Sequence, residues 1–480
     1  MQARLLSRET GDLSPRDFAR TITTQLLRSF APAPQHRFNG EVTSAPDPAG
    51  VDERAHNIRA HTAGVSSLAL DKFDGRILLS GGVEGAIKLW DLEACGNPHK
   101  VYMFRPVGII PRARRDQHAA GHTHGITHLA FYPFDPDAFL SSGYDKKLKL
   151  WATQSCQLSA SFDLNATIYS HTTSPIADHL LVAVATQHSN VRLVDLKSGS
   201  AVQALVAHGG PVLSTVWSPR HDHILASGHS DGKVRIWDIR RAGGVIAQLD
   251  QEDSLGIVHK FNDATATGMD WSQVPHFSTS ARAHDEPVNG LQWTDDGRYI
   301  VSAGLDRQIR VWDAATGANT LASFGSVIQN QHAKTASLLV TPTSLSTGND
   351  LLVWANDQEI LLLDLHDGHV VTRLRSPAVT NPVGPRGSQM GRNRITSIVW
   401  RGTGGGGHQI GPVMGGGNSL GAIYSSHMDG QIRAWEPHTP GPDDVDEEEE
   451  MDEDEETKRR KRKAVDDAYR SLMGKKITFT

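Results

Sequence analysis

Short apolar stretches that end in an acidic or small residue recur along most of this 480-residue chain. Their length and composition predict strands, and the many glycine and proline residues between them predict turns. The spacing of their ends is close to the ~40–45 residues that one four-stranded unit needs. Longer intervals after Asp238 and Asp364 predict inserted loops. Seven such ends are found, at or near Asp91, Ala152, Asp195, Asp238, Asp313, Asp364 and Glu436.

Five of the seven stretches contain a tryptophan that follows an acidic residue by six positions and a serine by ten. In four of the five, a histidine stands 28 or 29 positions before the tryptophan. This register is typical of WD-repeat β-propellers, in which four-stranded blades form a closed ring. The stretches at 191–195 and 360–364 lack the tryptophan but keep the apolar strand and its closing aspartate. We therefore predict an all-β, seven-bladed WD-repeat propeller.

The recurring set predicts one buried hydrogen-bond chain in a blade. The indole N–H donates to the serine hydroxyl, the hydroxyl to the histidine, and the histidine to the carboxylate of a turn. Serine, histidine and aspartate also form catalytic triads, but an active site is needed once and this set occurs in four blades, so we interpret it as structural. The predicted sets are His61, Ser80, Glu84 and Trp90; His122, Ser141, Asp145 and Trp151; His208, Ser227, Asp231 and Trp237; His284, Ser302, Asp306 and Trp312; and Ser425, Asp429 and Trp435.

Composition narrows the range of functions. The two cysteines, Cys95 and Cys156, and the absence of a histidine–cysteine cluster with zinc spacing predict neither a disulfide framework nor a metal site. No run approaches the ~20 apolar residues of a membrane span, and the first residues lack a signal-peptide core, so we expect a soluble intracellular protein. A phosphate-binding GxxxxGK[ST] motif is also missing. We expect no cofactor and no enzymatic activity.

The formal net charge of −6 hides two opposite runs near the C-terminus. Residues 443–456 hold twelve acidic side chains, which predicts a disordered tail over residues 437–480. Outside the two runs, basic and acidic residues are equal in number, which argues against a broad or sequence-specific nucleic-acid-binding surface. The basic run resembles a nuclear import signal, with solvated tail charge as the alternative. It consists of Lys458, Arg459, Arg460, Lys461, Arg462 and Lys463.

Residues 1–30 lie outside the repeats and predict a pair of helices. The first ends at Gly11, and Ser14 and Pro15 suit the start of the second. An apolar stripe on the second helix either packs on the chain's own propeller or enters a groove of a partner. We favour the partner, because a closed ring leaves the stripe no evident internal contact. The stripe consists of Phe18, Ile22, Leu26 and Phe30.

Residues 31–53 are interpreted as a linker and residues 54–436 as the propeller. A WD repeat begins with the outer strand of the preceding blade, so we expect about 54–60 to complete blade seven and close the ring. The glycine-rich stretch 402–417 predicts a hairpin extension within the last repeat.

Several motifs go beyond the generic repeat. They include Leu6-Ser-Arg-Glu-Thr-Gly11, Trp217-Ser-Pro-Arg220 and, most tellingly, Trp237-Asp-Ile-Arg-Arg241. On these motifs, most of residues 1–436 resembles the Cockayne syndrome group A family, the WD-repeat substrate receptors of cullin-4-type RING ubiquitin ligases in transcription-coupled nucleotide excision repair. The chain departs from that family in the glycine-rich stretch and in its long acidic and basic tail.

The resemblance implies partners and contact positions. Receptors of this class bind a damaged-DNA-binding adaptor through N-terminal helices and through an arginine two positions after a WD aspartate. Here that arginine is Arg240, whereas Glu93 and Ala315 hold the matching places in two other repeats. The implied substrates are a Cockayne syndrome group B type ATPase and stalled RNA polymerase II. The implied adaptor-binding residues are Leu5, Leu6, Arg8, Phe18, Ile22, Leu26, Phe30 and Arg240.

The resulting hypothesis is a non-enzymatic, nuclear substrate-recognition subunit that presents repair factors for ubiquitination. The alternative is a histone or chromatin chaperone, because helix-plus-propeller proteins with acidic tails can bind basic histones. Neither hypothesis involves a membrane.

Overall fold

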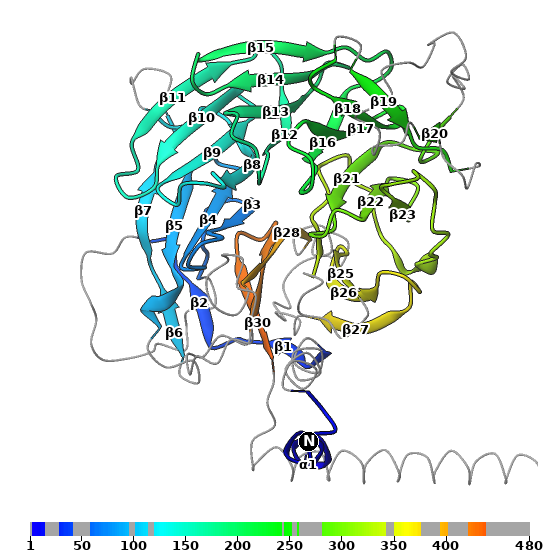
Figure 1. Ribbon diagram of the computed structural model, residues 1–480. Coiled ribbons are helices and arrows are strands. Elements are labelled where there is room, and N and C mark those ends of the chain that lie inside the picture. The colour runs from blue at the N-terminus through cyan, green and yellow to red at the C-terminus, as the bar shows by residue number, and fades with distance from the viewer. Residues whose placement is uncertain are drawn as a thin grey trace, which may run out of the picture. The chain divides into compact units, whose positions relative to one another are not determined.

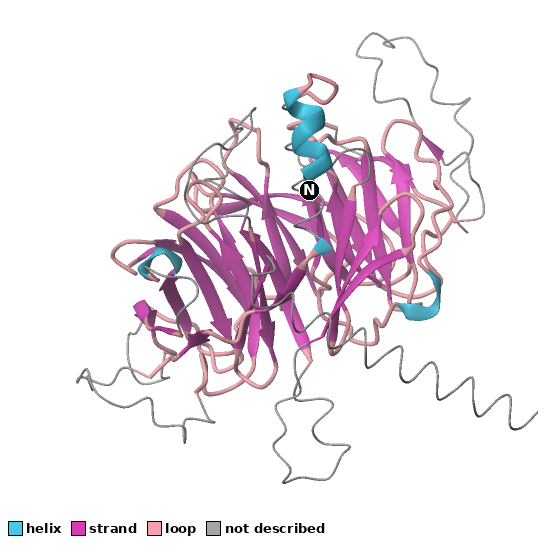
Figure 2. Ribbon diagram, turned by 90° about the horizontal axis from the view of Figure 1, so that it is seen from below, coloured by secondary structure: helices cyan, strands magenta, loops and turns pink. Residues whose placement is uncertain are grey.

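The computed structural model describes residues 2–14, 28–41, 58–95, 101–113, 120–241, 244–251, 257–258, 281–341, 350–375, 394–401 and 421–437. In this part of the chain, seven antiparallel sheets are arranged as blades around a common centre (Figure 1). Nearly all of the regular structure is strand (Figure 2). The prediction of an all-β, seven-bladed propeller is confirmed. None of the helices in the described segments is long and apolar enough to cross a lipid bilayer.

The first strand of each blade lies beside the first strand of the next blade, so these strands surround the centre of the ring. Blade one contains β3 (Val65–Leu70), β4 (Ile77–Gly82), β5 (Ile87–Asp91) and β7 (Pro106–Ile110). Blade two contains β8 (Ile126–Phe131), β9 (Ala138–Gly143), β10 (Lys147–Ala152) and β11 (Leu158–Asp163). Blade three contains β12 (Ile168–Thr173), β13 (Leu181–Thr186), β14 (Val191–Asp195) and β15 (Ser200–Leu205).

The remaining blades vary in strand number. Blade four has five described strands, β16 (Val212–Trp217), β17 (Ile224–His229), β18 (Val234–Asp238), β19 (Val245–Gln248) and β20 (Ile257–Val258). Blade five has three, β21 (Val288–Trp293), β22 (Tyr299–Gly304) and β23 (Ile309–Asp313). Blade six contains β24 (Leu338–Val340), β25 (Leu351–Ala355), β26 (Glu359–Asp364) and β27 (Val370–Arg375). Blade seven contains β28 (Ile395–Arg401), β29 (Ala422–His427), β30 (Ile432–Pro437) and β1 (Phe30–Pro32).

The ring closes through a strand that the sequence did not indicate. The outer strand of blade seven is β1, in which Phe30 pairs with Pro437 and Pro32 with Trp435. The expectation that about 54–60 would form this strand is wrong, since β1 occupies that edge and the described residues 58–60 belong to no strand. Burial of Phe30 favours β1 as the outer strand of blade seven, because its side chain is 4% exposed and packs between blades six and seven.

After β1, the chain crosses from the last blade to the first. Strand β2 (His36–Phe38) runs parallel to β6 (Tyr102–Phe104), which precedes the outer strand of blade one. Phe38 stacks on Phe104 at a centroid distance of 4.8 Å and meets the edge of the Trp90 ring. Residues 30–41, here called the strap, therefore join blade seven to blade one. The interpretation of residues 31–53 as a linker is therefore wrong where β1 and β2 form, and residues 42–53 lie outside the described residues.

The apolar core is divided among the seven junctions between neighbouring blades. For example, one cluster joins Leu79 and Ile87 of blade one to Ile126 and Phe139 of blade two. Each of the other clusters in the described residues likewise combines side chains from two adjacent blades. A blade therefore buries both faces only when the ring is complete, which favours closure.

Outside the ring, α1 (Gln2–Glu9) is the only α-helix in the described residues. It ends before Gly11, whose φ of +84° suits a glycine at the C-terminus of a helix. The predicted second helix, the hairpin extension over 402–417 and the tail with its basic run Lys458–Lys463 lie outside the described residues. Residues 438–480 form a unit separate from residues 1–437.

Candidate functional site

Blade one contains the predicted chain of buried polar side chains. The indole N–H of Trp90 donates to Oγ of Ser80 over 2.8 Å, and this hydroxyl lies 2.7 Å from Nε2 of His61. Nδ1 of the same imidazole contacts the carboxylate of Glu84. With Nδ1–H donating to the carboxylate, Nε2 is left to accept the serine proton, so every member of the chain has a partner.

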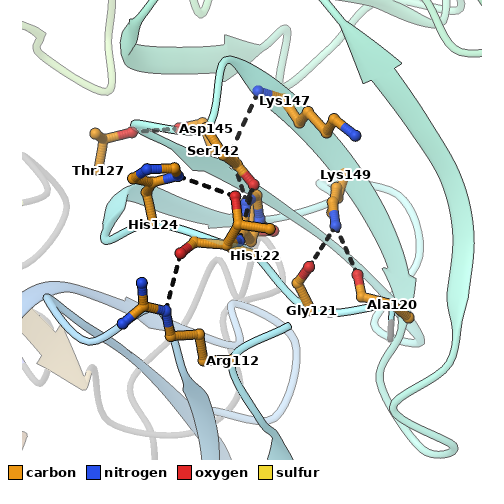
Figure 3. Close-up of polar contacts among 12 residues, drawn as sticks. Arg112, Ala120, Gly121, His122, His124, Thr127, Ser142, Asp145, Lys147 and Lys149 are labelled. Carbon is orange, nitrogen blue, oxygen red and sulfur yellow. Dashed lines mark hydrogen bonds and ion pairs between the residues drawn. The ribbon is translucent and has the colours of Figure 1, made fainter. Parts of the chain in front are cut away.

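Blades two and five repeat this arrangement. In blade two, Nε2 of His122 lies 2.6 Å from Oγ of Ser141. Nδ1 of the same ring lies 2.9 Å from Asp145 (Figure 3). In blade five, Nε2 of His284 lies 2.8 Å from Oγ of Ser302. Burial lowers the pKa of His122 and His284, although the neighbouring carboxylates act in the opposite direction. The imidazoles are therefore neutral near pH 7.

Blades four and seven contain a different histidine, and the assignment of His208 to the chain is wrong. The His208 side chain is exposed, and Oγ of Ser227 is instead 2.8 Å from Nε2 of His229. In blade seven, Nε2 of His427 lies 3.0 Å from Oγ of Ser425. Both histidines stand two positions after the serine, on the same strand, so the signal Ser-x-His was present in the sequence and was missed.

A second missed signal is a basic residue two positions before each of the five tryptophans. In blade two, the Lys149 ammonium donates to the carbonyls of Ala120 and Gly121, at 2.6 and 2.7 Å (Figure 3). In blade four, Arg235 donates to the carbonyl of His208 over 2.7 Å and also to the carboxylate of Asp231 over 2.9 Å. The arginine thus holds the turn carboxylate in a blade where no histidine from the preceding loop does so. Lys88 makes similar carbonyl contacts in blade one, and Arg433 binds Asp429 in blade seven.

These chains have no access for a substrate. The serine and tryptophan side chains in all five are at most 1% exposed. The serine hydroxyl also accepts the indole proton, so it is fixed on both sides. A buried hydroxyl of this kind cannot attack a substrate, and the arrangement is suited to hold three strands of a blade together.

Only one group of three possible metal ligands is found in the described residues, and it forms a turn. Ligand atoms of Asp364, Asp367 and His369 lie within 4.8 Å of one another. Asp364 already accepts hydrogen bonds from the backbone N–H groups of His366 and Asp367. We assign this group no metal.

Arg240 is presented to solvent by a buried carboxylate. Its Nε and Nη2 atoms each lie 3.0 Å from an oxygen of Asp238, and its backbone N–H donates to the same carboxylate. Arg241 approaches that carboxylate more loosely, with Nε at 3.4 Å. Burial raises the pKa of Asp238, but hydrogen bonds from Arg240 outweigh it and the pKa is lowered. The Arg240 side chain remains 63% exposed, so a rigidly oriented cation faces solvent.

Exposed apolar side chains accompany Arg240 at the same end of neighbouring blades. In an antiparallel blade, the turn between strands one and two and the turn between strands three and four lie at the same end. Phe134 occupies the first such turn in blade two, and Ile176 and Leu180 occupy it in blade three. A hydrogen bond of 3.0 Å from His179 to the carbonyl of Asp222 connects the turns of blades three and four. We call Arg240 together with these exposed apolar residues the Arg240 face.

Comparisons with known proteins agree with this architecture. A family model described as WD domain, G-beta repeat, matches residues 53–91, 116–152, 199–238 and 276–313, which end with the third strands of blades one, two, four and five. WD repeat-containing protein ATCSA-1 of Arabidopsis thaliana is 30% identical over 327 residues, which cover 57% of this chain and 71% of that protein. The chain belongs to the WD-repeat family.

Two further relatives of this WD-repeat protein are more distant. Radiation-sensitive protein 28 of Saccharomyces cerevisiae is 27% identical over 199 residues, which cover 40% of this chain and 38% of that protein. Ribosome biogenesis protein YTM1 of Phaeosphaeria nodorum is 25% identical over 274 residues, which cover 52% of this chain and 54% of that protein. Propellers of this family typically act as scaffolds for other molecules.

The predicted adaptor-binding residues lie in different environments. Leu6, 63% exposed, and the exposed Arg8 lie on α1, and Arg240 lies on blade four. Leu5 belongs to α1, but its side chain is not among those described. Phe18, Ile22 and Leu26 lie outside the described residues. The prediction for Phe30 is wrong, because burial between blades six and seven leaves its ring no surface for a partner.

Proposed function

We propose that this WD-repeat protein is the substrate-recognition subunit of a cullin-4-type RING ubiquitin ligase in transcription-coupled nucleotide excision repair. In this proposal, α1 and the Arg240 face bind the damaged-DNA-binding adaptor. The other end of the propeller binds the protein that is to be ubiquitinated, for which a Cockayne syndrome group B type ATPase and stalled RNA polymerase II are the candidates. The basic run Lys458–Lys463 directs the protein to the nucleus.

The geometry of Arg240 carries the proposal. Asp238 holds the guanidinium in a bidentate contact, so little side-chain entropy is lost when a partner binds it. Exposed apolar residues of blades two and three and the exposed Leu6 on α1 supply further contacts of the kind that protein interfaces use. The cation and the apolar side chains together suit a protein partner better than a nucleic acid, which would call for many cations.

The names of two relatives also support the proposed role. The name of the plant relative describes a WD-repeat protein, and the name of the yeast relative refers to sensitivity to radiation, which is consistent with a role in DNA repair. A receptor of this kind needs no catalytic residue. It raises the effective concentration of substrate lysines near the ubiquitin-carrying enzyme, and the rate increases through proximity.

The test measures binding of the recombinant adaptor to the full-length protein by calorimetry or surface plasmon resonance. Arg240→Ala should weaken binding by about ten- to a hundredfold, the range for an arginine at the centre of an interface. Arg241→Ala is the matched control, since both side chains are exposed and share Asp238. The control should change the affinity much less, and circular dichroism of both variants checks that the propeller remains folded.

Two outcomes would contradict the proposal. If Arg240→Ala binds the adaptor as tightly as the parent, the Arg240 face is not the contact. If the parent does not bind the adaptor but captures core histones, and removal of residues 443–456 abolishes that capture, the chaperone alternative is correct.

A further inference from the structure

A cysteine, a histidine and a glutamate form a linear chain where the last blade meets the first. His36 lies in β2 of the strap, Glu436 in β30 of blade seven, and Cys95 directly after the short turn η1 (Leu92–Ala94) that follows β5 of blade one. Sγ of Cys95 lies 3.7 Å from Nε2 of His36. Nδ1 of the same imidazole lies 2.8 Å from Oε1 of Glu436. Neither the buried tryptophan chains nor the Arg240 face uses these residues.

This order of groups is that of an activated nucleophile. The Glu436 carboxylate lies within ion-pair distance of Nδ1 of His36, and its negative charge favours a proton on that nitrogen. In this tautomer Nε2 carries the free lone pair and faces the thiol. The thiol proton can then move to Nε2, and the carboxylate stabilises the resulting imidazolium. Because the thiolate is the reactive form of cysteine, a nearby proton acceptor increases its reactivity.

Burial fixes the imidazole, whereas Cys95 as a residue is only partly buried. The His36 side chain is 5% exposed, and its ring packs edge-on against Phe104 at a centroid distance of 5.7 Å. Cys95 is only partly buried, at the margin of the apolar cluster that contains Phe38 and Phe104. Tyr424 belongs to the same cluster, and burial raises its pKa to about 12, so its phenol stays neutral beside the chain. We take the partial exposure of Cys95 as the route by which a small reagent reaches the thiol.

We propose that Cys95 is a modification site whose thiol reacts with peroxides. The thiol proton passes to Nε2 of His36, and the sulfur attacks one peroxide oxygen. The S–O bond forms, the O–O bond breaks, and the leaving oxygen takes the proton back from His36. Cys95 becomes a sulfenic acid, oxidised by two electrons, and the peroxide is reduced to water or an alcohol. The modified atom lies at the seam between blades one and seven, and the proposal does not depend on adaptor binding.

Cys156 serves as an internal control, because it is the only other cysteine in the chain and is also partly buried. Its Sγ lies 3.7 Å from the carbonyl of Thr153, which accepts its proton in a hydrogen bond but is no base. Burial raises the pKa of the Cys156 thiol, which disfavours the reactive thiolate. The two thiols thus differ mainly in the presence of an imidazole.

The experiment treats the full-length protein with hydrogen peroxide in the presence of dimedone, and mass spectrometry follows the labelling of each cysteine-containing peptide. Cys95 should be labelled at least about tenfold faster than Cys156 at pH 7. His36→Asn should reduce the Cys95 rate to about that of Cys156. Glu436→Gln should give an intermediate Cys95 rate, as expected of a residue that positions the imidazole.

Equal labelling rates for the two cysteines of the parent would overturn the proposal, as would a Cys95 rate that neither substitution changes. The Cys156 rate in each variant reports on folding, since unfolding exposes both thiols. If His36→Asn increases the labelling rate of Cys156, the substitution has disturbed the fold. The labelling rate of Cys95 in Glu436→Gln then tests the proposal. A Cys95 rate equal to that of the parent in this second variant contradicts the role of the carboxylate and of the chain.

Discussion

At the scale of single residues, each of five blades needs one imidazole beside its buried serine, and the chain supplies it from two places. In blades one, two and five, the histidine comes from the loop before the first strand. In blades four and seven, His229 and His427 come from the serine's own strand, two positions later. The turn carboxylate is then held by an arginine, as Arg235 holds Asp231. The common requirement is a hydrogen-bond partner for the buried serine hydroxyl and the indole N–H of each blade.

This difference predicts that two histidines of blade four contribute unequally to stability. His229→Ala removes the partner of the buried Ser227 hydroxyl and leaves a cavity, so the free energy of unfolding should fall by about 1–3 kcal/mol. His208→Ala changes an exposed side chain and should alter the free energy by less than ~0.5 kcal/mol. Chemical denaturation followed by tryptophan fluorescence measures both. A larger loss from His208→Ala would restore the assignment made from spacing alone.

The tryptophan and the serine could be predicted because they lie on adjacent strands in fixed register. In blade one, Trp90 pairs with Leu78, and Ser80 pairs with Lys88. The length of the turn between β4 and β5 therefore determines their spacing. The histidine is less constrained, since a loop or a neighbouring strand position can place the ring equally well. His208 has the expected spacing, and spacing alone cannot show that its side chain faces solvent.

At the scale of elements, the strap controls how the ring is closed. Strand β1 satisfies the outer edge of blade seven, and β2 continues to blade one. Lys88 ties the strap to the first repeat by donating to the carbonyls of Gly40 and Ala60, at 2.9 and 2.8 Å. This element could not be predicted, because β1 is three residues long and its partner lies about 400 residues away in sequence. Blades three and six, which lack the chain of tryptophan, serine and histidine, could be predicted because each keeps an apolar strand and its closing aspartate.

Phe30, which lies in the strap, is expected to stabilise the closed ring. Phe30→Ala should lower the free energy of unfolding by about 3–5 kcal/mol, because it empties a site between blades six and seven. Leu6→Ala on α1 is the control from the same predicted docking segment, and its exposed side chain should contribute little to stability. Melting temperatures of the two variants test the distinction. Equal melting temperatures would show that β1 is not needed to close the ring.

At the scale of the whole molecule, stability depends on seven junctions that also bury neutral histidines. His128 and His171 face each other across blades two and three, with ring centroids 4.7 Å apart. Burial lowers the pKa of His128 to about 4 and the pKa of His171 well below its ordinary value. In blade four, burial lowers the pKa of His229 to about 3. Each of these rings is neutral in the folded ring and free to gain a proton when the chain unfolds.

The sign of the resulting pH dependence follows from proton binding. Below about pH 6.5, the ordinary histidine pKa, the unfolded chain binds more protons than the folded chain, so the free energy of unfolding should fall as the pH decreases from about 6.5 to about 4. A histidine such as His128 contributes on the order of 3 kcal/mol at most to this loss. Asp350 and Asp429, whose pKa values burial raises, oppose it at the acidic end. Below pH 4, protonation of Asp306, whose pKa lies at about 2, adds to the loss.

Urea unfolding at a series of pH values between 7 and 4 measures this dependence. His128→Gln should flatten the curve, because it removes one group that takes up a proton only on unfolding. His208→Gln, at an exposed position, should leave the slope as it is in the parent. A free energy of unfolding that stayed constant over this range, in the parent and in His128→Gln alike, would mean that the buried histidines take up protons equally in the folded and unfolded states. That result would contradict the hydrogen-bond chains in which buried neutral imidazoles share a proton with the hydroxyls of Ser141, Ser227 and Ser302.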